Sequence, residues 1–297
     1  MKIGIHGREF HGQSALFVER VLRAFSDLGA ELFVTSKFVK YLGSARFKPF
    51  HFQIIEAGSN LSKLKLFVSL GGDGTLLESV MYIGKYQTPI LGINTGRMGF
   101  LATISREEAA GAIKHFMAGK YTIDSRILLK LETNPTLFGG INYALNDCTI
   151  MKKDSASMIT VHVYVNNELL NSYWADGVVI STPTGSTGYS LSCGGPIVYP
   201  ESQSFIITPV SPHTLTARPV ILPDSSIITF KIEGRKKKFL VSLDSRFESV
   251  DESITLKIKK EKFQAQLVQL PGQHYFKTLR QKLNWGLDVR NWRPHEK

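Results

Sequence analysis

The sequence predicts an α/β N-terminal domain with a doubly wound, Rossmann-like parallel sheet, followed by a mostly-β C-terminal domain. Three observations lead to this fold class. Strand-like and helical segments alternate through about the first hundred residues. The stretch Leu64–Leu70 reads as an apolar strand of the kind that a parallel sheet buries on both faces. Beyond about residue 118, β-like segments separated by Asn, Gly and Pro replace the helical spacing.

The N-terminal elements follow from the spacing of apolar residues. Helical spacing over Gln13–Leu28 predicts the first helix, and Gly29 follows where that helix ends. Ser105 and Glu108 have the spacing of a capping box, which predicts a later helix running to about Ala118. The remaining elements expected in this half are strands at Lys2–His6, Glu31–Thr35, Phe52–Glu56, Leu64–Leu70 and Pro89–Ile93, and a helix at Thr75–Lys85.

The second half changes character, and this change sets the expected domain boundaries. An amphipathic helical pattern returns at Tyr275–Trp285. We therefore expect an α/β domain at residues 1–101, completed by 275–297, and a mostly-β domain at 102–274. The β-like segments are Ile127–Glu132, Ser157–Val165, Gly177–Ser181, Ile227–Ile232 and Ile254–Ile258.

The chain is strongly basic, with a formal net charge of +11 over 297 residues. Such a charge attracts polyanions, which include phosphorylated small molecules as well as nucleic acids. The sharpest basic run, Arg235–Lys238, lies between two β-like stretches, and we expect it to form a solvated hairpin tip. Because no interleaved aromatic residues or nucleic-acid motif accompany it, we expect no nucleic-acid partner.

Cysteine usage and hydropathy bear on the compartment. Cys148 and Cys193 are the two cysteines, too few for a disulfide framework, and neither CxxC nor HExxH occurs. No apolar run approaches the roughly 20 residues that a membrane span needs. The N-terminus lacks the apolar core of a signal peptide. We expect a cytoplasmic protein with no membrane partner and no metal site built from His and Cys.

The glycine loop, Gly71-Gly72-Asp73-Gly74-Thr75, carries the chemistry of the first half. It directly follows a buried strand and precedes a helix, and in an open parallel sheet the ligand crevice lies at the carboxyl ends of the strands. Glycines let a backbone approach a phosphate closely, and a helix N-terminus favours an anion. A plain strand-to-helix turn is the alternative, but such turns seldom place three glycines around one carboxylate.

Neither of the two best-known phosphate loops is present. The chain has no GxxxxGK[ST] string, and the GxGxxG fingerprint that starts at Gly72 meets Leu77 at its last glycine. A carboxylate repels phosphate, so Asp73 makes more sense as a base that accepts a proton from an attacking hydroxyl.

The glycine loop resembles a motif of the superfamily that contains NAD kinases, diacylglycerol and sphingosine kinases and, more distantly, phosphofructokinases. Three further segments resemble those of NAD kinases: Asn94–Leu101, the pair Asn146-Asp147, and the long run Asp176–Pro196, which is the most specific. The resemblance covers about residues 66 to 200. Weaker matches lie at Leu243–Arg246 and Leu279–Gly286.

The resemblance implies an NAD kinase, which transfers the γ-phosphoryl group of ATP to the 2′-hydroxyl of the adenosine ribose of NAD to make NADP, with Asp73 as general base. NAD and ATP would be the partners, and a divalent cation, Mg²⁺, would be held largely by the phosphates without an assigned protein ligand. In the family the Asp176 position can serve a site shared with a neighbouring subunit, which implies a homo-oligomer, a dimer or a tetramer.

The resemblance also assigns binding residues. Asn146 with Asp147 would hold the nicotinamide-side ribose and its ring, although from the residues alone an Asx turn explains this pair equally well. The run from Thr182 to Gly188 could likewise be an ordinary polar loop. The implied phosphate-loop residues are Gly71, Gly72, Gly74 and Thr75, and the implied NAD-binding residues are Asp73, Gly74, Asn146, Asp147, Asp176, Thr184, Thr187, Gly188, Tyr189, Ser190, Leu191 and Ser192.

Four positions depart from the family pattern, and two of them, Trp174 and Arg246, leave the preference between NAD and NADH open. Asp147 stands where many members have Glu, and Gly188 stands where Ala is usual. Trp174 occupies a position where some members carry a basic residue, and Arg246 falls where others have an amide.

Three other functions compete with this hypothesis. A lipid kinase shares the glycine loop, but the run Asp176–Pro196 argues against it. A dinucleotide-sensing regulator without turnover is disfavoured by the intact Asp73. Inorganic polyphosphate as the phosphoryl donor is excluded by nothing in the residues.

Overall fold

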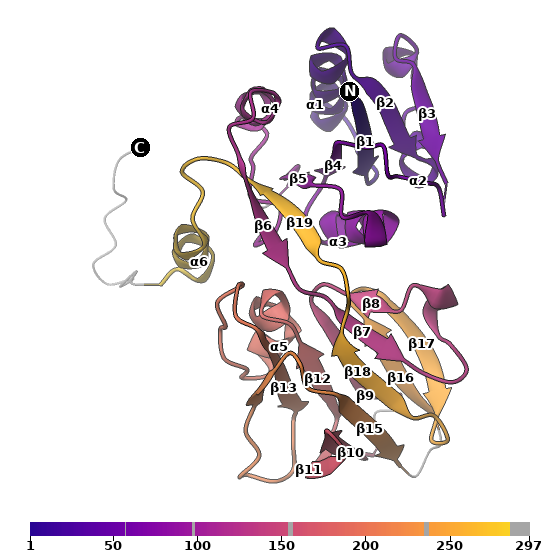
Figure 1. The fold of residues 1–297 in the computed structure, drawn as a ribbon, viewed down its shortest axis with the longest axis vertical. Coiled ribbons are helices and arrows are strands. Elements are labelled where there is room, and N and C mark those ends of the chain that lie inside the picture. The colour runs from indigo at the N-terminus through magenta and orange to yellow at the C-terminus, as the bar shows by residue number, and fades with distance from the viewer. Residues whose placement is uncertain (57, 97–98, 154–156, 235–237, 286–297) are drawn as a thin grey trace. The chain divides into compact units, whose positions relative to one another are not determined.

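The computed structural model describes residues 1–56, 58–96, 99–153, 157–234 and 238–285. The chain divides into two compact units (Figure 1). The α/β unit contains a parallel sheet with helices, and the β-rich unit contains antiparallel sheets, so the predicted fold class is confirmed. The α/β unit comprises Met1–Tyr82, Thr88–Asp124 and Gln266–Lys297, and the β-rich unit comprises Ile83–Gln87 and Ser125–Ala265.

These units divide the chain at other points than the sequence pattern suggested. Residues 102–124 and 266–274, expected in the β domain, lie in the α/β unit. Helix α4 (Ala109–Met117) is the first reason, because Ile113 and Phe116 pack into the same core as helix α1. Strand β19 (Ala265–Gln269) is the second, because it joins the sheet of the α/β unit in parallel with β5. Packing of these two elements is a tertiary effect that local spacing does not reveal.

The sheet of the α/β unit has the strand order β3-β2-β1-β4-β5-β19-β6 among the described residues. Strand β1 lies between β2 and β4, so the order reverses there, and the β1–β2, β2–β3, β1–β4 and β4–β5 pairs are parallel. A reversal of this kind opens a crevice at the carboxyl ends of β1 and β4. The strands are β1 Lys2–Gly7, β2 Glu31–Thr35, β3 Phe52–Ile55, β4 Leu66–Leu70, β5 Ile90–Ile93, β6 Thr122–Arg126 and β19.

Helices cover both faces of this sheet. Leu91 and Ile93 of β5 pack into one core with α1 and α4. Gly92, between them, faces the other way, where a methyl group on it would lie 2.8 Å from Leu76 Cδ1 of α3. Helix α3 therefore covers the face opposite α1 and α4, as a doubly wound sheet requires. The helices are α1 Gln13–Asp27, α2 Ser36–Val39, α3 Asp73–Ile83, α4 and α6 Tyr275–Leu283, with 3₁₀ turns at Ala45–Phe47 and Gly84–Tyr86.

The capping box predicted before α4 is formed. The Ser105 N–H donates to Glu108 Oε2 at 2.9 Å, and the Glu108 N–H donates to Ser105 Oγ at 3.3 Å. The α-helix itself begins at Ala109, because residues 106–108 form a turn under this box.

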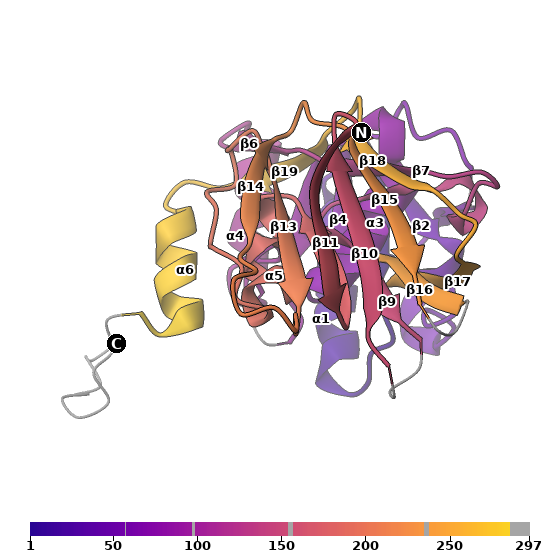
Figure 2. The same ribbon diagram turned by 90° about the horizontal axis from the view of Figure 1, so that it is seen from below.

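The β-rich unit contains two sheets of antiparallel strands, with orders β11-β10-β15-β18-β7-β8 and β14-β13-β12-β9-β16-β17 among the described residues. Figure 2 shows β11, β10, β15 and β18 lying side by side in the first of them. The strands are β7 Leu129–Glu132, β8 Tyr143–Ala144, β9 Asp147–Lys152, β10 Ile159–Val165, β11 Glu168–Ala175, β12 Gly177–Ser181, β13 Ser204–Val210, β14 Val220–Pro223, β15 Ile228–Glu233, β16 Lys238–Leu243, β17 Arg246–Asp251 and β18 Leu256–Lys260. The short helical elements are Phe138–Gly140, η4 Thr184–Thr187 and α5 Tyr189–Ser192.

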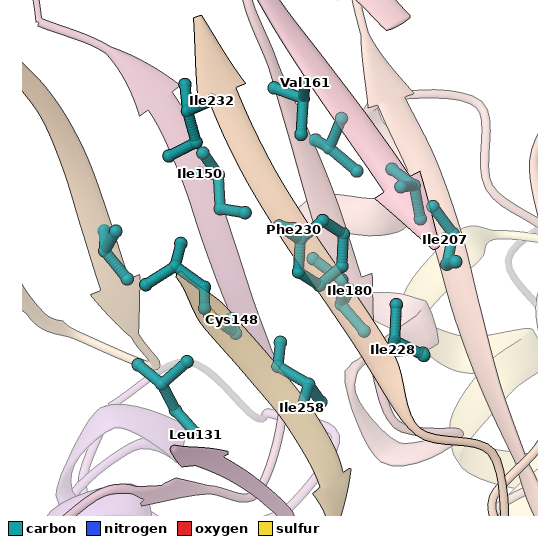
Figure 3. Close-up of a cluster of buried hydrophobic side chains, with 14 of the residues drawn as sticks. Leu131, Cys148, Ile150, Val161, Ile180, Ile207, Ile228, Phe230, Ile232 and Ile258 are labelled. Carbon is teal, nitrogen blue, oxygen red and sulfur yellow. The ribbon is translucent and has the colours of Figure 1, made fainter. Parts of the chain in front are cut away.

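A single apolar core fills the space between these two sheets (Figure 3). Strand β10 buries alternate residues, such as Val161 and Val163, as a strand with one solvated face does. Figure 3 shows side chains of the two sheets, including Ile150, Ile180 and Phe230, pointing into this layer. The packed sandwich is the rigid support for the loops at its edge.

The basic run Arg235–Lys238 was expected to form a solvated hairpin tip. Residues 235–237 lie outside the described residues, and the strands on either side, β15 and β16, belong to different sheets. Separately, none of the helices in the described ranges is long and apolar enough to cross a membrane.

Candidate active site

The glycine loop forms the connection from β4 to α3. A methyl group on Gly71 would overlap the Thr75 side chain, which is buried beneath it, so this glycine and Thr75 are needed by the fold. Gly72, by contrast, has open space where a side chain would stand. The loop is thus closed on its protein side and open on the other, which leaves its backbone accessible to a ligand.

The start of α3 has unused hydrogen-bond donors. The Thr75 and Leu76 amides donate to the Gly72 carbonyl at 3.0 and 3.2 Å. Among the described residues, the amides of Asp73 and Gly74 have no acceptor. Free amides and the positive end of the helix dipole make this point suited to a phosphate.

The Asp73 carboxylate is held by the segment after β5. Its Oδ2 accepts the Phe100 amide at 2.8 Å, and its Oδ1 accepts the amides of Leu101 and Ala102, both at 3.0 Å. A methyl group on Gly99 would overlap this carboxylate, so a glycine is required there. An ionised carboxylate offers about four acceptor positions. About one position therefore remains for a hydroxyl group.

A cluster of charged side chains lies beside the glycine loop. Glu78, two turns into α3, accepts Arg8 Nη2 at 2.8 Å and Lys37 Nζ at 2.8 Å. The buried His6 ring approaches the same carboxylate at 3.2 Å and bonds Thr35 through its other nitrogen. Burial acts to raise the pKa of Glu78, but the hydrogen bonds from His6, Lys37 and Arg8 outweigh it and lower the pKa to about 2. Glu78 is thus ionised whenever the protein is folded near neutral pH.

This charge cluster leaves net positive charge beside the loop. The side chains of Arg8 and Lys37 are 53% and 55% exposed, so both cations reach solvent although one anion anchors them. Arg8 Nη2 lies 3.1 Å from the position of a methyl group on Gly74, which places the guanidinium across the start of α3. These residues were not predicted, since Arg8, Lys37 and Glu78 are far apart in the chain and form no motif.

The described residues of this site offer few ligands to a divalent cation. The described residues contain no group of three or more His, Cys, Asp or Glu side chains that could hold a metal. Asp73 spends most of its acceptor capacity on backbone amides. Since Mg²⁺ is commonly bound by one or two carboxylates and by phosphate oxygens, the donor set is compatible with an ion that phosphates hold.

The pair Asn146-Asp147 lies at the start of β9 in the β-rich unit. Asp147 is buried, and burial together with the charge of Asp244 raises its pKa to about 7. The Asn146 Oδ1 atom is buried and has no hydrogen-bond partner among the described residues. A buried acceptor without a donor is costly, so this atom is a natural place for a ligand group to bond.

The segment Thr182–Ser192 packs against this pair. A methyl group on Gly185 would overlap the Asn146 carbonyl, and the Thr182 hydroxyl donates to the Leu145 carbonyl at 2.5 Å. A methyl group on Gly188 would lie 3.9 Å from Asp147 Oδ2. The segment Thr182–Ser192 is therefore packed against Asn146 and Asp147 and is not a free loop.

The predicted residues of this segment divide into two groups. Thr184 and Ser190 are buried and bonded within the protein, Thr184 to Arg126 Nη1 at 3.1 Å and Ser190 to Thr208 at 2.8 Å. Tyr189 and Ser192 are exposed, and Thr187, Gly188 and Leu191 are partly exposed. The residues of the second group are the ones that can reach a ligand. Arg126 was missed by the sequence reasoning.

Asp176 is placed at the β11–β12 connection, where it pairs with Lys152 Nζ at 2.5 Å. Trp174, two residues earlier, is about half exposed and packs against His213 with ring centroids 4.3 Å apart and the rings tilted by 44°. Glycine loop residues lie in the α/β unit and the residues from Asn146 onward lie in the β-rich unit.

The chain matches two models of protein families. They are described as the ATP-NAD kinase N-terminal domain, matched by residues 4–121, and the ATP-NAD kinase C-terminal domain, matched by residues 145–270. It is 50% identical over 292 residues to the NAD kinase of Cytophaga hutchinsonii, with 98% of this chain and 100% of that protein covered. It is 42% identical over 294 residues to the NAD kinase of Flavobacterium johnsoniae, with the same coverage.

Two solved structures are similar to the whole chain. A yeast NADH kinase complexed with NADH superposes with a TM-score of 0.85 at 23% identity, covering 99% of this chain and 90% of that one, which shows a common fold. An NAD kinase from Archaeoglobus fulgidus in complex with ATP superposes with a TM-score of 0.73 at 26% identity, covering 96% and 99%.

Proposed function

This chain belongs to the ATP-NAD kinase family, and we propose that it transfers the γ-phosphoryl group of ATP to the 2′-hydroxyl of the adenosine ribose of NAD. The single observation that carries the donor half is the glycine loop, with its free amides at the start of α3 and the cations Arg8 and Lys37 beside them. These groups attract and orient a triphosphate, which carries several negative charges.

Asp73 is the general base of the proposed reaction. Its carboxylate accepts the proton of the 2′-hydroxyl as the oxygen attacks the γ-phosphorus. The bond between the γ-phosphorus and its bridging oxygen breaks in the same process, and ADP leaves. The amides of Phe100, Leu101 and Ala102 fix the orientation of the carboxylate, so its remaining acceptor position points in one direction. A positioned base of this kind contributes roughly 10²–10⁴-fold to the rate.

The NAD-binding residues are proposed in the β-rich unit. Asn146 and Asp147 bind the nicotinamide-side ribose and its ring, and the exposed Tyr189 packs on the dinucleotide together with Thr187, Gly188, Leu191 and Ser192. The unpartnered Asn146 Oδ1 supports this assignment. Thr184 and Ser190 act indirectly, because their hydroxyls are already bonded to Arg126 and Thr208.

Charge neutralisation at the transferring phosphate is completed by a divalent cation, Mg²⁺, held by phosphate oxygens. The chain supplies the rest of the positive field through Arg8, Lys37 and the α3 amides. In this proposal Asp73, Gly72 and Gly74 orient the substrates and do not bind the metal.

Assembly and location are further parts of the proposal. We place the protein in the cytoplasm as a homo-oligomer, in which Asp176 serves a site shared between subunits. Both cysteines are free thiols, as a reducing compartment favours. Exposed apolar side chains on the edge strands β11 and β14, including Leu169 and Ile221, are compatible with a subunit interface.

One assay tests the reaction directly. The purified protein is incubated with NAD, ATP and Mg²⁺, and the product is detected with an NADP-specific dehydrogenase. We expect NADP that depends on all three components, and we expect NADH in place of NAD to show the substrate preference. Label transfer to a lipid, with no signal from either dinucleotide, would contradict the proposal. Replacing ATP by inorganic polyphosphate identifies the donor, because the cation cluster alone does not select between them.

A further inference from the structure

Asp244 lies in the turn of a β-hairpin in the β-rich unit. Leu243 at the end of β16 pairs with Arg246 at the start of β17, which leaves Asp244 and Ser245 as the turn. Asp244 has a φ of 51°, in the left-handed region that Asp and Asn tolerate better than other side chains. Its backbone conformation therefore favours a short acidic or amide side chain.

The Asp244 carboxylate collects the backbone amides of three consecutive residues. Its Oδ2 accepts the Leu145 amide at 3.0 Å, and its Oδ1 accepts the Asn146 and Asp147 amides at 2.8 and 3.3 Å. In return the Asp244 amide donates to the Asp147 carbonyl at 3.0 Å. Hydrogen bonds to a charged group are stronger than neutral ones, so this contact fixes the backbone firmly.

Arg246, on the same hairpin, holds the preceding residues by their carbonyl groups. Its Nη1 donates to the Ile141 carbonyl, and its Nη2 donates to the Tyr143 carbonyl at 2.6 Å. The anion of the hairpin thus binds amides and the cation binds carbonyls along one continuous stretch, residues 141–147. Arg246 acts on the backbone in this arrangement, and its guanidinium is engaged by the protein.

We propose that Asp244 is a positioning residue of the dinucleotide site, which holds the backbone of residues 145–147 so that the Asn146 and Asp147 side chains meet NAD in a fixed orientation. The inference rests on the proposed function, because it takes Asn146 and Asp147 as NAD-binding residues. It adds a role for a residue that has no place in the reaction itself and no contact with the reacting atoms.

The charge of Asp244 also raises the pKa of Asp147. Burial raises the pKa of both carboxyls, but the three amides and Arg246 act to lower that of Asp244, whereas the charge of Asp244 raises that of Asp147 further. From the other elements around Asp147, β12 contributes Ser181, which does not titrate, and the α5 region contributes Tyr189 and Cys193. Burial raises the pKa of both of these last groups, so they are neutral near pH 7. The charge of Asp244 is therefore the one that acts on Asp147.

The variant Asp244→Asn tests the proposal. Asn keeps the size and tolerates the left-handed turn, but it loses the charge and turns an NH₂ group toward an amide donor. We expect the KM for NAD to rise about tenfold while the KM for ATP changes less than about twofold. The matched control is Asp251→Asn, at the other end of β17, where the exposed carboxylate bonds Ser253 and no change in either KM is expected.

The pH profile separates positioning from a purely structural role. If ionised Asp147 accepts the ribose hydroxyls, the KM for NAD of the wild type rises as the pH falls below about 7. In Asp244→Asn this rise should move to lower pH, because the neighbouring charge is gone. A lower melting temperature with an unchanged KM and an unchanged pH profile would show that Asp244 only supports the fold and would overturn the inference.

A second variant and a binding measurement cover the remaining outcomes. Asp244→Glu keeps the charge but lengthens the side chain, so we expect a raised KM for NAD with the wild-type pH profile; if Asp244→Asn does not fold, an unchanged KM in Asp244→Glu overturns the inference. Calorimetric titration with NAD needs no turnover. Binding that Asp244→Asn weakens, in a protein without kinase activity, would leave the inference intact and refute the proposed reaction, whereas no binding by the wild type would refute both.

Discussion

Asp73 and Asp244 make the same contact in two different parts of the chain. Each carboxylate accepts three consecutive backbone amides, Asp73 from residues 100–102 and Asp244 from residues 145–147. Their surroundings differ. Beside Asp73 lie free helix amides and the cation Arg8, whereas beside Asp244 lies a second carboxyl, that of Asp147.

This difference shows that neighbours, and not the contact itself, decide what such a carboxylate does. Around Asp73 the field is positive and the loop is open at Gly72, which suits an anionic phosphoryl donor. Around Asp244 two carboxyls, its own and that of Asp147, outnumber the cation Arg246, which suits a ligand rich in hydroxyl donors. We therefore expect Asp73 variants to lower the rate of the reaction and Asp244 variants to weaken binding of the dinucleotide.

The largest expected effect comes from Asp73→Asn. The amide is a poor base, and its NH₂ group would also face one of the three amides of residues 100–102. We expect kcat to fall roughly 10²–10⁴-fold, with the affinity for NAD changed much less. Steady-state kinetics with calorimetric titration of NAD measure both. If the variant keeps more than about a tenth of the wild-type kcat, Asp73, like Asp244, is not needed for the chemical step. The proposed difference between the two carboxylates would then be refuted.

A smaller effect is expected when a side chain is added at Gly99, beside the Asp73 carboxylate. Gly99→Ala places a methyl group against the carboxylate, while Gly96→Ala, the matched control in the same segment, meets its nearest atom, Asn94 Oδ1, only at 3.9 Å. Displacing a packed group typically costs about 1–3 kcal/mol, so we expect Gly99→Ala to lose about ten- to a hundredfold in kcat. Gly96→Ala should keep wild-type kinetics. Equal losses in both variants would indicate a general effect on the segment and not on Asp73.

A still smaller effect is expected for a variant of the charge cluster beside the glycine loop. Arg8→Met removes a half-exposed guanidinium beside Gly74, and we expect the KM for ATP to rise about three- to tenfold with the KM for NAD unchanged. Arg46→Met is the control, because Arg46 makes an ion pair with Glu19 in the same unit, away from the loop. The difference between the variants should shrink at high salt. A rise in the KM for NAD alone would assign Arg8 to the other substrate.

The sequence predicted much of the fold because the local patterns are strong. Strand β2 was predicted with its observed bounds, and α1 within one residue, since apolar spacing and flanking glycines mark such elements. Helix α4 and strand β19 fall within the residues expected in the β domain, but they pack in the α/β unit. Their partners, α1 and β5, are distant in sequence, so local spacing does not reveal this packing. The expected hairpin tip at Arg235–Lys238 falls mostly on residues outside the described ones, and the flanking strands β15 and β16 pair with β10 and β9.

The candidate site was predicted only where a motif carried it. Asp73, Asn146 and Asp147 belong to recognisable strings, but Arg8, Lys37 and Glu78 meet through the β1–β4 arrangement of the sheet and leave no local signal. Thr75 and Ser190 were expected to bind ligands; both are buried, and the Ser190 hydroxyl bonds Thr208, which spacing cannot show. For Asp244, a lone acidic residue between two β-like stretches was the available signal.

The smallest expected effect is on stability, and it sharpens the contrast between the two carboxylates. The folded-state pKa of Asp147 is about 7 against an ordinary value of 3.8, so the folded protein binds this proton more tightly than the unfolded chain does. Stability is therefore lost as the pH rises from about 4 through 7. Asp147→Asn removes the titrating group, and we expect its advantage over the wild type in free energy of unfolding to grow by about 1–2 kcal/mol between pH 6 and pH 8. Urea unfolding at both pH values measures this, with Asp251→Asn as a control that should show no such gain. A loss of stability at the higher pH would mean that ionised Asp147 is favourably bonded in the fold, and that the negative field around Asp244 is weaker than its geometry implies.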